Sequence, residues 1–295
     1  MRLNGKYLIP AAIGLMLICL CVLYFVGRHD RKQQAAEAAL SPLPRIHEVL
    51  KNGKSVFLSG EFIPLLAHYY SIQLPTLSEV AGCEDASAFY RLNREKRFSA
   101  LFLSTRPASL KLVRDLMESP LWVLSEVLPG GYLFLPAGSP AWSLPEPGYW
   151  LKTFPNPDVR SSWLIGTAAA LIPIGRSSDA EQLLSLAEAI ARKKSLIFAT
   201  RASLDASRGD WRSALRLSRE SLHLNHGDLV AEMIEIRALT ECGHSDEALL
   251  KARRLAEKEE NQETLFLLAR TASAANSTQE EIDALQRLVR LARRH

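Results

Sequence analysis

The sequence predicts three parts in series: an N-terminal transmembrane helix, a small α/β domain and a C-terminal all-α solenoid of helix pairs. A long uncharged run near the start predicts the first part, and short apolar runs alternating with amphipathic segments predict the second. Glycines spaced 34 residues apart predict the third. We place the anchor at residues 1–27, a linker at 28–45, the α/β domain at 46–157 and about four helical repeats at 158–295.

The composition is that of an ordinary folded protein, with 47% hydrophobic and 23% charged residues in a chain of 295. The formal net charge of +4 arises upstream of residue 161, because basic and acidic residues are equal in number beyond that point. No dense basic stripe is present, so we expect no nucleic-acid partner. Cys83 and Cys242, the cysteines outside the N-terminal run, form neither a disulfide framework nor a zinc-binding pattern.

Residues 8–26 carry no charge and are flanked by basic residues on both sides. A helix of that length just spans a bilayer core of about 30 Å. A cleaved signal peptide would need the small-residue site at Ala36–Ala38, which lies beyond a charged patch, and the bulky Ile18 argues against lipid attachment at Cys19. We therefore expect an uncleaved single-pass anchor. The flanking charges are nearly balanced, but a basic N-terminal segment before one apolar run favours an extracytoplasmic location for the bulk, with the cytoplasmic side left open.

Beyond a linker that ends in Ser41-Pro42-Leu43-Pro44, short runs rich in Val, Phe and Leu indicate buried strands. Two are followed by amphipathic segments, and the last two flank the turn sequence Pro129-Gly130-Gly131. The alternation predicts a mostly parallel sheet, and a loop over residues 137–157 closes the domain. The predicted strands are residues 55–58, 99–103, 121–127 and 132–135, and the predicted helices are 62–70 and 108–117.

Ligands of parallel sheets bind at the carboxyl ends of the strands, where this domain carries polar side chains. The alternative is that these residues only form ordinary strand-to-helix turns with capping side chains. The possible ligand site consists of Ser59, Gly60, Glu61, Ser104, Thr105 and Arg106.

Residues 50–135 resemble the soluble tail domains that follow the last membrane helix of polytopic lipid-linked-sugar glycosyltransferases. Val56-Phe57-Leu58-Ser59 and Ala67-His68-Tyr69-Tyr70 carry this resemblance. The catalytic residues of that family lie in a multispan membrane part that this sequence lacks. The resemblance therefore implies an accessory domain outside the cytoplasm and not a transferase.

An internal repeat governs the last part of the chain. A glycine permits a tight interhelical turn, the polar residues after it cap the next helix, and an alanine five residues on lets two helices approach closely. Helix pairs of this kind leave an apolar face open unless they stack. The repeated turn positions are Gly175, Gly209, Gly243 and Ser277, and those five residues later are Ala180, Ala214, Ala248 and Ile282.

Residues 161–295 resemble the tetratricopeptide repeat (TPR) family through this spacing, Trp211, and the small Ala168 and Ala202 of the first helices. Ile236 and Arg270 depart from the pattern, since that family has a small residue there. The resemblance implies a right-handed superhelix whose concave face holds a peptide or protein. A generic helical bundle with an accidental period is the alternative.

Placing each first helix in the 34-residue register gives a predicted binding groove. It is small-to-apolar, with Arg237 and Glu241 as its only charges, and lacks the Lys and Asn cluster that related arrays use to hold a terminal carboxylate. An apolar or helical partner segment should therefore bind with little effect of salt; alternatively, the α/β domain or linker fills the groove. The predicted groove residues are Leu196, Ala199, Val230, Met233, Arg237, Glu241, Leu267 and Thr271.

No catalytic motif stands out. Asn52-Gly53-Lys54-Ser55 lacks the first glycine of a phosphate-binding loop. His223 and His226 lie near the end of a repeat helix, and no Asp, Glu or Cys completes a metal set with them. We expect no enzyme activity, metal or cofactor.

The predicted function is a membrane-anchored scaffold or adaptor that binds other proteins. The alternative is an accessory of a cell-envelope glycan or polysaccharide pathway whose α/β domain binds a sugar or lipid-linked ligand, and the oligomeric state is open.

Overall fold

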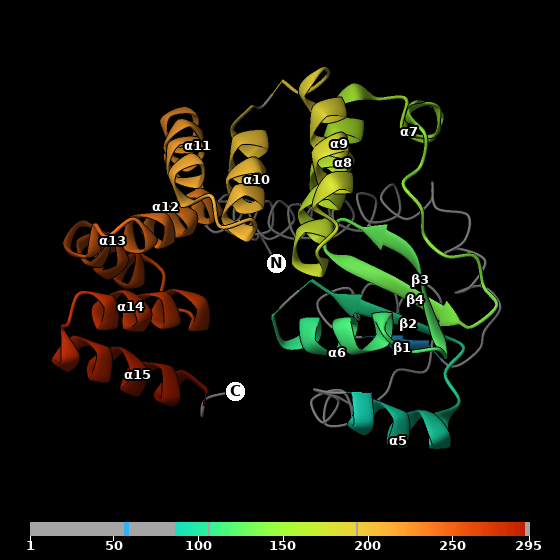
Figure 1. Ribbon diagram of the computed structural model, residues 1–295, viewed down its shortest axis with the longest axis horizontal. Coiled ribbons are helices and arrows are strands. Elements are labelled where there is room, and N and C mark those ends of the chain that lie inside the picture. Colours follow the sequence, from blue (N-terminus) through green and yellow to red (C-terminus); the bar gives the residue numbers. More distant parts are fainter. Residues whose placement is uncertain (1–55, 59–85, 106, 193, 293–295) are drawn as a thin grey trace, which may run out of the picture.

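The structure, a computed structural model, describes residues 56–58, 86–105, 107–192 and 194–292 (Figure 1). The predicted anchor at residues 8–26, the linker and the predicted helix at 62–70 lie outside these ranges. Among the described helices, none has the length and apolar character that a membrane crossing requires.

Four strands form one sheet in the order β1-β2-β4-β3, and each predicted strand is confirmed to within one residue at either end. The prediction of a mostly parallel sheet is wrong: β1 and β2 are parallel, whereas β4 pairs antiparallel with both β2 and β3. The reason is the short turn after β3, because a parallel pair needs a crossover of a dozen or more residues. The strands are Val56–Leu58 (β1), Ala100–Ser104 (β2), Trp122–Leu128 (β3) and Gly131–Pro136 (β4).

Three of the described helices lie in the α/β part of the chain. The amphipathic segment predicted after β2 is α6 (Pro107–Met117), whereas α5 (Ala86–Lys96) was not predicted. Phe89 on α5 packs edge-on against Phe57 of β1, with ring centroids 5.7 Å apart. The segment predicted as a closing loop contains α7 (Pro147–Thr153), which begins with proline in the first turn and buries Trp150.

Four helix pairs follow, and they form a solenoid in which each pair packs on the next. Figure 1 shows the series running sideways from α8 to α11 and then curving downward, so that α14 and α15 lie at the opposite end of the array from α8 and α9. The helices are α8 (Pro157–Leu171), α9 (Ser177–Glu188), α10 (Lys194–Ser207), α11 (Trp211–Leu224), α12 (Leu229–Glu241), α13 (Ser245–Lys258), α14 (Gln262–Ala274) and α15 (Thr278–Ala292), with a short 3-10 helix η1 (Ile172–Ile174) after α8.

The interhelical turns show that the fourth repeat is one residue out of the predicted register. Gly175, Gly209 and Gly243 have positive φ angles of 77°, 80° and 85°, and in the fourth turn Asn276 (φ 57°) takes this conformation instead of Ser277. Asparagine is among the few residues other than glycine that enter the left-handed region readily.

Backbone hydrogen bonds identify the same equivalence. The residue after each positive-φ position donates its amide to the carbonyl five residues earlier, as in Asp210 to Asp205 (2.9 Å) and Ser277 to Ala272 (2.8 Å). The buried Ala269, and not the exposed Arg270, is therefore the small residue of the fourth first helix. Ile282, which is 43% exposed, is not the equivalent of the buried alanines at 180, 214 and 248.

The sheet and the first helix pair share one core. Tyr132 on β4 donates its buried hydroxyl to the Ala170 carbonyl of α8 at 2.6 Å, and this burial raises the pKa of the phenol. Gly166 of α8 lies so close to Pro129 that an added Cβ would be 2.6 Å from the proline Cβ. The buried cluster runs without interruption from β1 through α8 and α9 into α10. The boundary that we placed at residue 158 thus marks a change in amino-acid composition, while the buried core continues from one side of it to the other.

Candidate protein-binding surface

The first helices of successive pairs lie next to one another. Among the described helices, α10 contacts both α8 and α12, and α12 also contacts α14. Equivalent positions on these helices therefore form one continuous surface. We call its exposed and half-buried side chains the first-helix face: Leu196, Val230, Met233, Arg237, Glu241, Glu263, Phe266 and Arg270.

The structure separates the predicted groove residues into two groups. Leu196 and Val230 are 43% and 55% exposed, Arg237 and Glu241 are also exposed, and Met233 is half-buried. The remaining three predicted residues, Ala199, Leu267 and Thr271, are buried and do not line the surface. On α14 the reason is a shorter connection: three residues (259–261) join α13 to α14, whereas four (225–228) join α11 to α12, and this one-residue shift turns Leu267 and Thr271 inward.

Phe266 and Arg270 take the two positions that Leu267 and Thr271 leave. Phe266 is 59% exposed, which is unusual for a phenylalanine on a helix whose neighbouring apolar residues are buried. The sequence signal that was missed is Asn276, which stands directly before Ser277 and suits a left-handed turn.

Charges cluster on α12 and α14. Arg270 Nη2 lies 2.6 Å from Glu241 Oε1 and so links the two helices. The guanidinium of Arg237 lies over the Trp211 ring, 5.6 Å from its centroid, and burial together with the nearby Arg270 lowers its pKa. With Glu263 exposed in the first turn of α14, the face carries two basic and two acidic side chains. The prediction that Arg237 and Glu241 are the only charges is therefore wrong.

In the α/β domain, two of the six possible ligand-site residues are described. Ser104 ends β2, is buried, and has its Oγ 3.1 Å from Ser109 Oγ. Thr105 donates its backbone amide to the Gly130 carbonyl at 3.0 Å. Since β1 and β2 are parallel neighbours, their carboxyl ends lie at the same edge of the sheet, as the prediction requires. Ser59, Gly60, Glu61 and Arg106 lie outside the described residues, so the ligand site stays a prediction.

The described residues contain no group of three or more His, Cys, Asp and Glu side chains close enough together to hold a metal ion. His223 and His226 are exposed at the C-terminal end of α11.

No protein-family model matches the sequence, and no curated protein matches it either. Among solved structures, the chain is similar to the crystal structure of YrrB, described as a TPR protein with an unusual peptide-binding site. The similarity has 14% sequence identity and a TM-score of 0.40, and it covers 50% of this chain and 77% of that one. At this level of similarity, the YrrB structure supports no further conclusion about this chain. The assignment of the C-terminal part therefore depends on its helix pairs, turns and buried alanines. The C-terminal part is a TPR-like helical array.

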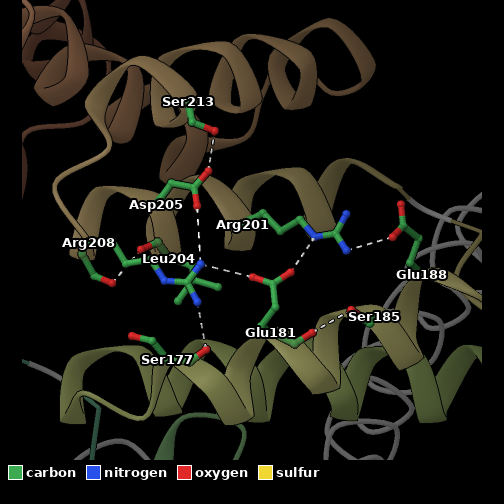
Figure 2. A network of polar contacts seen from close by, with 10 residues as sticks. Ser177, Glu181, Ser185, Glu188, Arg201, Leu204, Asp205, Arg208 and Ser213 are labelled. Carbon is green, nitrogen blue, oxygen red and sulfur yellow. Dashed lines mark hydrogen bonds and ion pairs between the residues drawn. The ribbon is translucent and has the colours of Figure 1, made fainter.

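A network of ion pairs joins the first two pairs of the TPR-like array (Figure 2). Arg201 of α10 places Nη2 2.8 Å from Glu188 Oε2 and Nε 3.8 Å from Glu181 Oε1, both on α9. Arg208 Nη1 lies 3.4 Å from the other Glu181 oxygen, and its Nη2 donates to the Ser177 carbonyl at 3.4 Å. The network holds α10 at a defined position on the helix pair that packs against the sheet.

A buried carboxylate connects the next helices. The Glu235 side chain is 5% exposed and receives Arg219 Nε of α11 at 3.0 Å and Lys251 Nζ of α13 at 3.1 Å. The two basic partners and their direct hydrogen bonds compensate the buried negative charge of Glu235. Loss of these partners would strongly destabilise the protein. Glu235 therefore orients α12, the helix that carries four residues of the first-helix face.

Proposed function

We propose that the chain is a membrane-anchored scaffold or adaptor that binds another protein on the first-helix face of its TPR-like array. The observation that carries this proposal is the exposure of Leu196, Val230 and Phe266 on three neighbouring first helices. Large apolar side chains exposed on one continuous, well-supported surface favour a protein-binding role, because their burial by a partner is the main source of affinity.

The composition of the face favours an amphipathic segment as its partner. The exposed apolar residues suit apolar anchors spaced as on a helix or strand. The described contacts of Arg237 place its guanidinium over the Trp211 ring, while Glu241 is already bonded to Arg270. A partner carboxylate next to an apolar anchor would pair with Arg237. We therefore expect the affinity for the partner to fall partly as the salt concentration rises, whereas an uncharged groove would bind with little effect of salt.

The anchor at residues 8–26 and the extracytoplasmic location of the bulk are part of the proposal on the strength of the sequence. Removing residues 1–27 should release the protein from membranes. If that fragment still fractionates with membranes after a high-salt wash, the single-anchor proposal is wrong. Nothing among the described residues favours the sugar-pathway alternative.

The binding proposal is tested by replacing Val230 or Phe266 with Asp in the full-length protein. Partners captured from solubilised membranes by the unmodified protein are identified, and the affinity of each for the variants is measured. Leu250→Asp is the matched control, because Leu250 is 47% exposed but lies on the second helix α13.

The proposal expects the two face variants to bind at least tenfold more weakly with an unchanged melting temperature, while the control binds normally. Equal binding by all three variants would assign the partner to another surface. Loss of stability in the face variants, with partners retained, would mean that the face packs against another part of this chain.

A further inference from the structure

The last helix of the array has an open apolar face. Ile282, Leu285 and Val289 of α15 are 43%, 41% and 50% exposed, and their spacing places them on one side of the helix. On another side, Ala284 is buried and Leu288 is partly buried against the core shared with α14. Helix α15 is thus apolar on two sides, of which the array covers one.

The repeat shows what normally lies on the open side. With the register corrected at Asn276, the residues of α13 that correspond to Ile282, Leu285 and Val289 are Leu249, Ala252 and Ala256. All three are buried, and α13 packs against α14, the first helix of the next pair. The open side of α15 is therefore the side that accepts another helix elsewhere in the array.

The charges around this face match a second copy of the same helix. Asp283 and Arg290 are both exposed next to the apolar residues and stand seven residues apart, as Ile282 and Val289 also do. Their described contacts are weak and local: Asp283 Oδ1 accepts from Gln279 Nε2 at 3.1 Å, and Arg290 Nε donates to the Gln286 carbonyl at 3.3 Å.

Two α15 helices packed antiparallel around a twofold axis would bring together the apolar pair, Ile282 and Val289, and also the charged pair, Asp283 and Arg290. An axis near residues 285 and 286 sets Ile282 opposite Val289 of the second copy. The same axis sets Asp283 opposite Leu288 of the second copy, so Arg290 lies two residues, about 3 Å along the helix, from the position directly opposite Asp283, within reach of its long side chain. Since the axis repeats every contact, the interface contains two such ion pairs around an apolar centre.

We propose that the protein forms a symmetric homodimer through antiparallel pairing of its two α15 helices. The interface uses no residue of the first-helix face, so it is independent of the proposed partner binding. One helix pair is a small interface, which corresponds to a weak dimer in dilute solution.

The test measures the dimer dissociation constant of solubilised full-length protein by analytical ultracentrifugation over a concentration series. Asp283→Arg and Arg290→Asp each place like charges opposite one another, and each should weaken the dimer at least tenfold. An equimolar mixture of the two variants should recover dimerisation, because both ion pairs then join opposite charges. Leu285→Asp should abolish it.

Arg254→Asp is the control, since Arg254 is exposed on α13 and this variant makes the same change in charge as Arg290→Asp. Circular dichroism and the melting temperature establish that every variant is folded. A full-length protein that stays monomeric throughout the series would overturn the proposal. So would self-association that is insensitive to Leu285→Asp, or a variant mixture that fails to recover, because the contact would then lie elsewhere or have another geometry.

Discussion

Asn276 marks the turn at which the one-residue register shift of the fourth repeat is visible in the backbone. Its φ of 57° ends α14 one residue earlier than the glycine spacing predicts. The shift arises earlier, in the α13–α14 connection, which is one residue shorter than the α11–α12 connection, so the residues of α14 and α15 face directions different from the predicted ones. Phe266 and Arg270 reach the surface in this way, and Leu267 is buried.

This residue provides a direct test of the corrected register. Asn276→Ala should lower the free energy of unfolding by about 1 kcal/mol, because a left-handed conformation is costly for residues with a Cβ and Asn tolerates it best. Asn276→Gly should be neutral or slightly stabilising. Urea denaturation of the two variants measures the difference.

Ser277→Gly is the informative control. If Ser277 held the left-handed position, glycine there would stabilise the protein. In this structure Ser277 precedes α15, where serine is a favoured capping residue, so its replacement should give no gain. A clear stabilisation by Ser277→Gly would contradict the corrected register.

At the scale of elements, the array is joined to the sheet through α8. Asn156 caps the start of this helix, since its Oδ1 accepts from the Asp158 and Val159 amides, and the helix places Gly166 against the turn between β3 and β4. Glycine inside a helix is normally unfavourable. Here the absence of a Cβ permits contact with Pro129, which is why the helix can lie so close to the sheet.

Gly166→Ala should therefore destabilise the protein by about 1–3 kcal/mol through overpacking, despite the better helix propensity of alanine. Gly148→Ala in α7 is the matched control, because nothing lies within 4 Å of the added Cβ. It should be neutral or stabilising by up to about 1 kcal/mol. Thermal unfolding of both variants measures the contrast, and equal effects would mean that α8 does not pack tightly on the turn.

The stability that the ion pair between α13 and α15 contributes should depend on pH. Arg253 donates Nη2 to Glu280 Oε2 at 2.6 Å and also donates Nε to the other carboxylate oxygen. The hydrogen bond from Arg253 lowers the pKa of Glu280, with burial opposing the effect. Because the folded-state pKa is lowered, the stabilisation is fully present above the unfolded-state pKa and is lost as the pH falls through the folded-state value.

Glu280→Gln removes this titration. The unmodified protein should be more stable than the variant at pH 7, and the difference should shrink as the pH drops below the usual carboxyl range. Urea denaturation of both proteins at several pH values gives the difference. A difference that is constant from pH 7 down to pH 3 would show that the Glu280 charge contributes nothing.

At the scale of the whole molecule, the continuous core makes the first helix pair part of both the α/β domain and the array. Leu164, Ala168 and Leu171 on α8 belong to the same buried cluster as Leu101 and Phe134 of the sheet. In Figure 1 the array runs outward from this pair. The first-helix face therefore has a defined position relative to the sheet.

A fragment of residues 158–295 should consequently melt at a lower temperature than the full-length protein. Removing the sheet exposes the apolar side of α8, at about 25 cal/mol per Å² of lost burial, and removes the Tyr132 hydrogen bond. Hydrogen exchange should show the greatest loss of protection in α8 and α9 and the least in α13 and α14. Full protection of α8 in the fragment would mean that the array does not depend on the sheet.

The sequence by itself determined the local structure: four strands, α6 and the helix pairs with their glycine turns, because residue periodicity and turn preferences act over short distances. It also placed Leu196, Val230, Arg237 and Glu241 at the surface. Only the tertiary structure decided the strand order, the packing of α8 on the sheet and the left-handed turn at Asn276. Strand pairing and helix packing join residues far apart in the chain, and two adjacent residues, Asn276 and Ser277, each suit a turn by local preference. The α13–α14 connection, one residue shorter than the α11–α12 connection, brings Phe266 and Arg270 to the surface and places Asn276 in the left-handed turn.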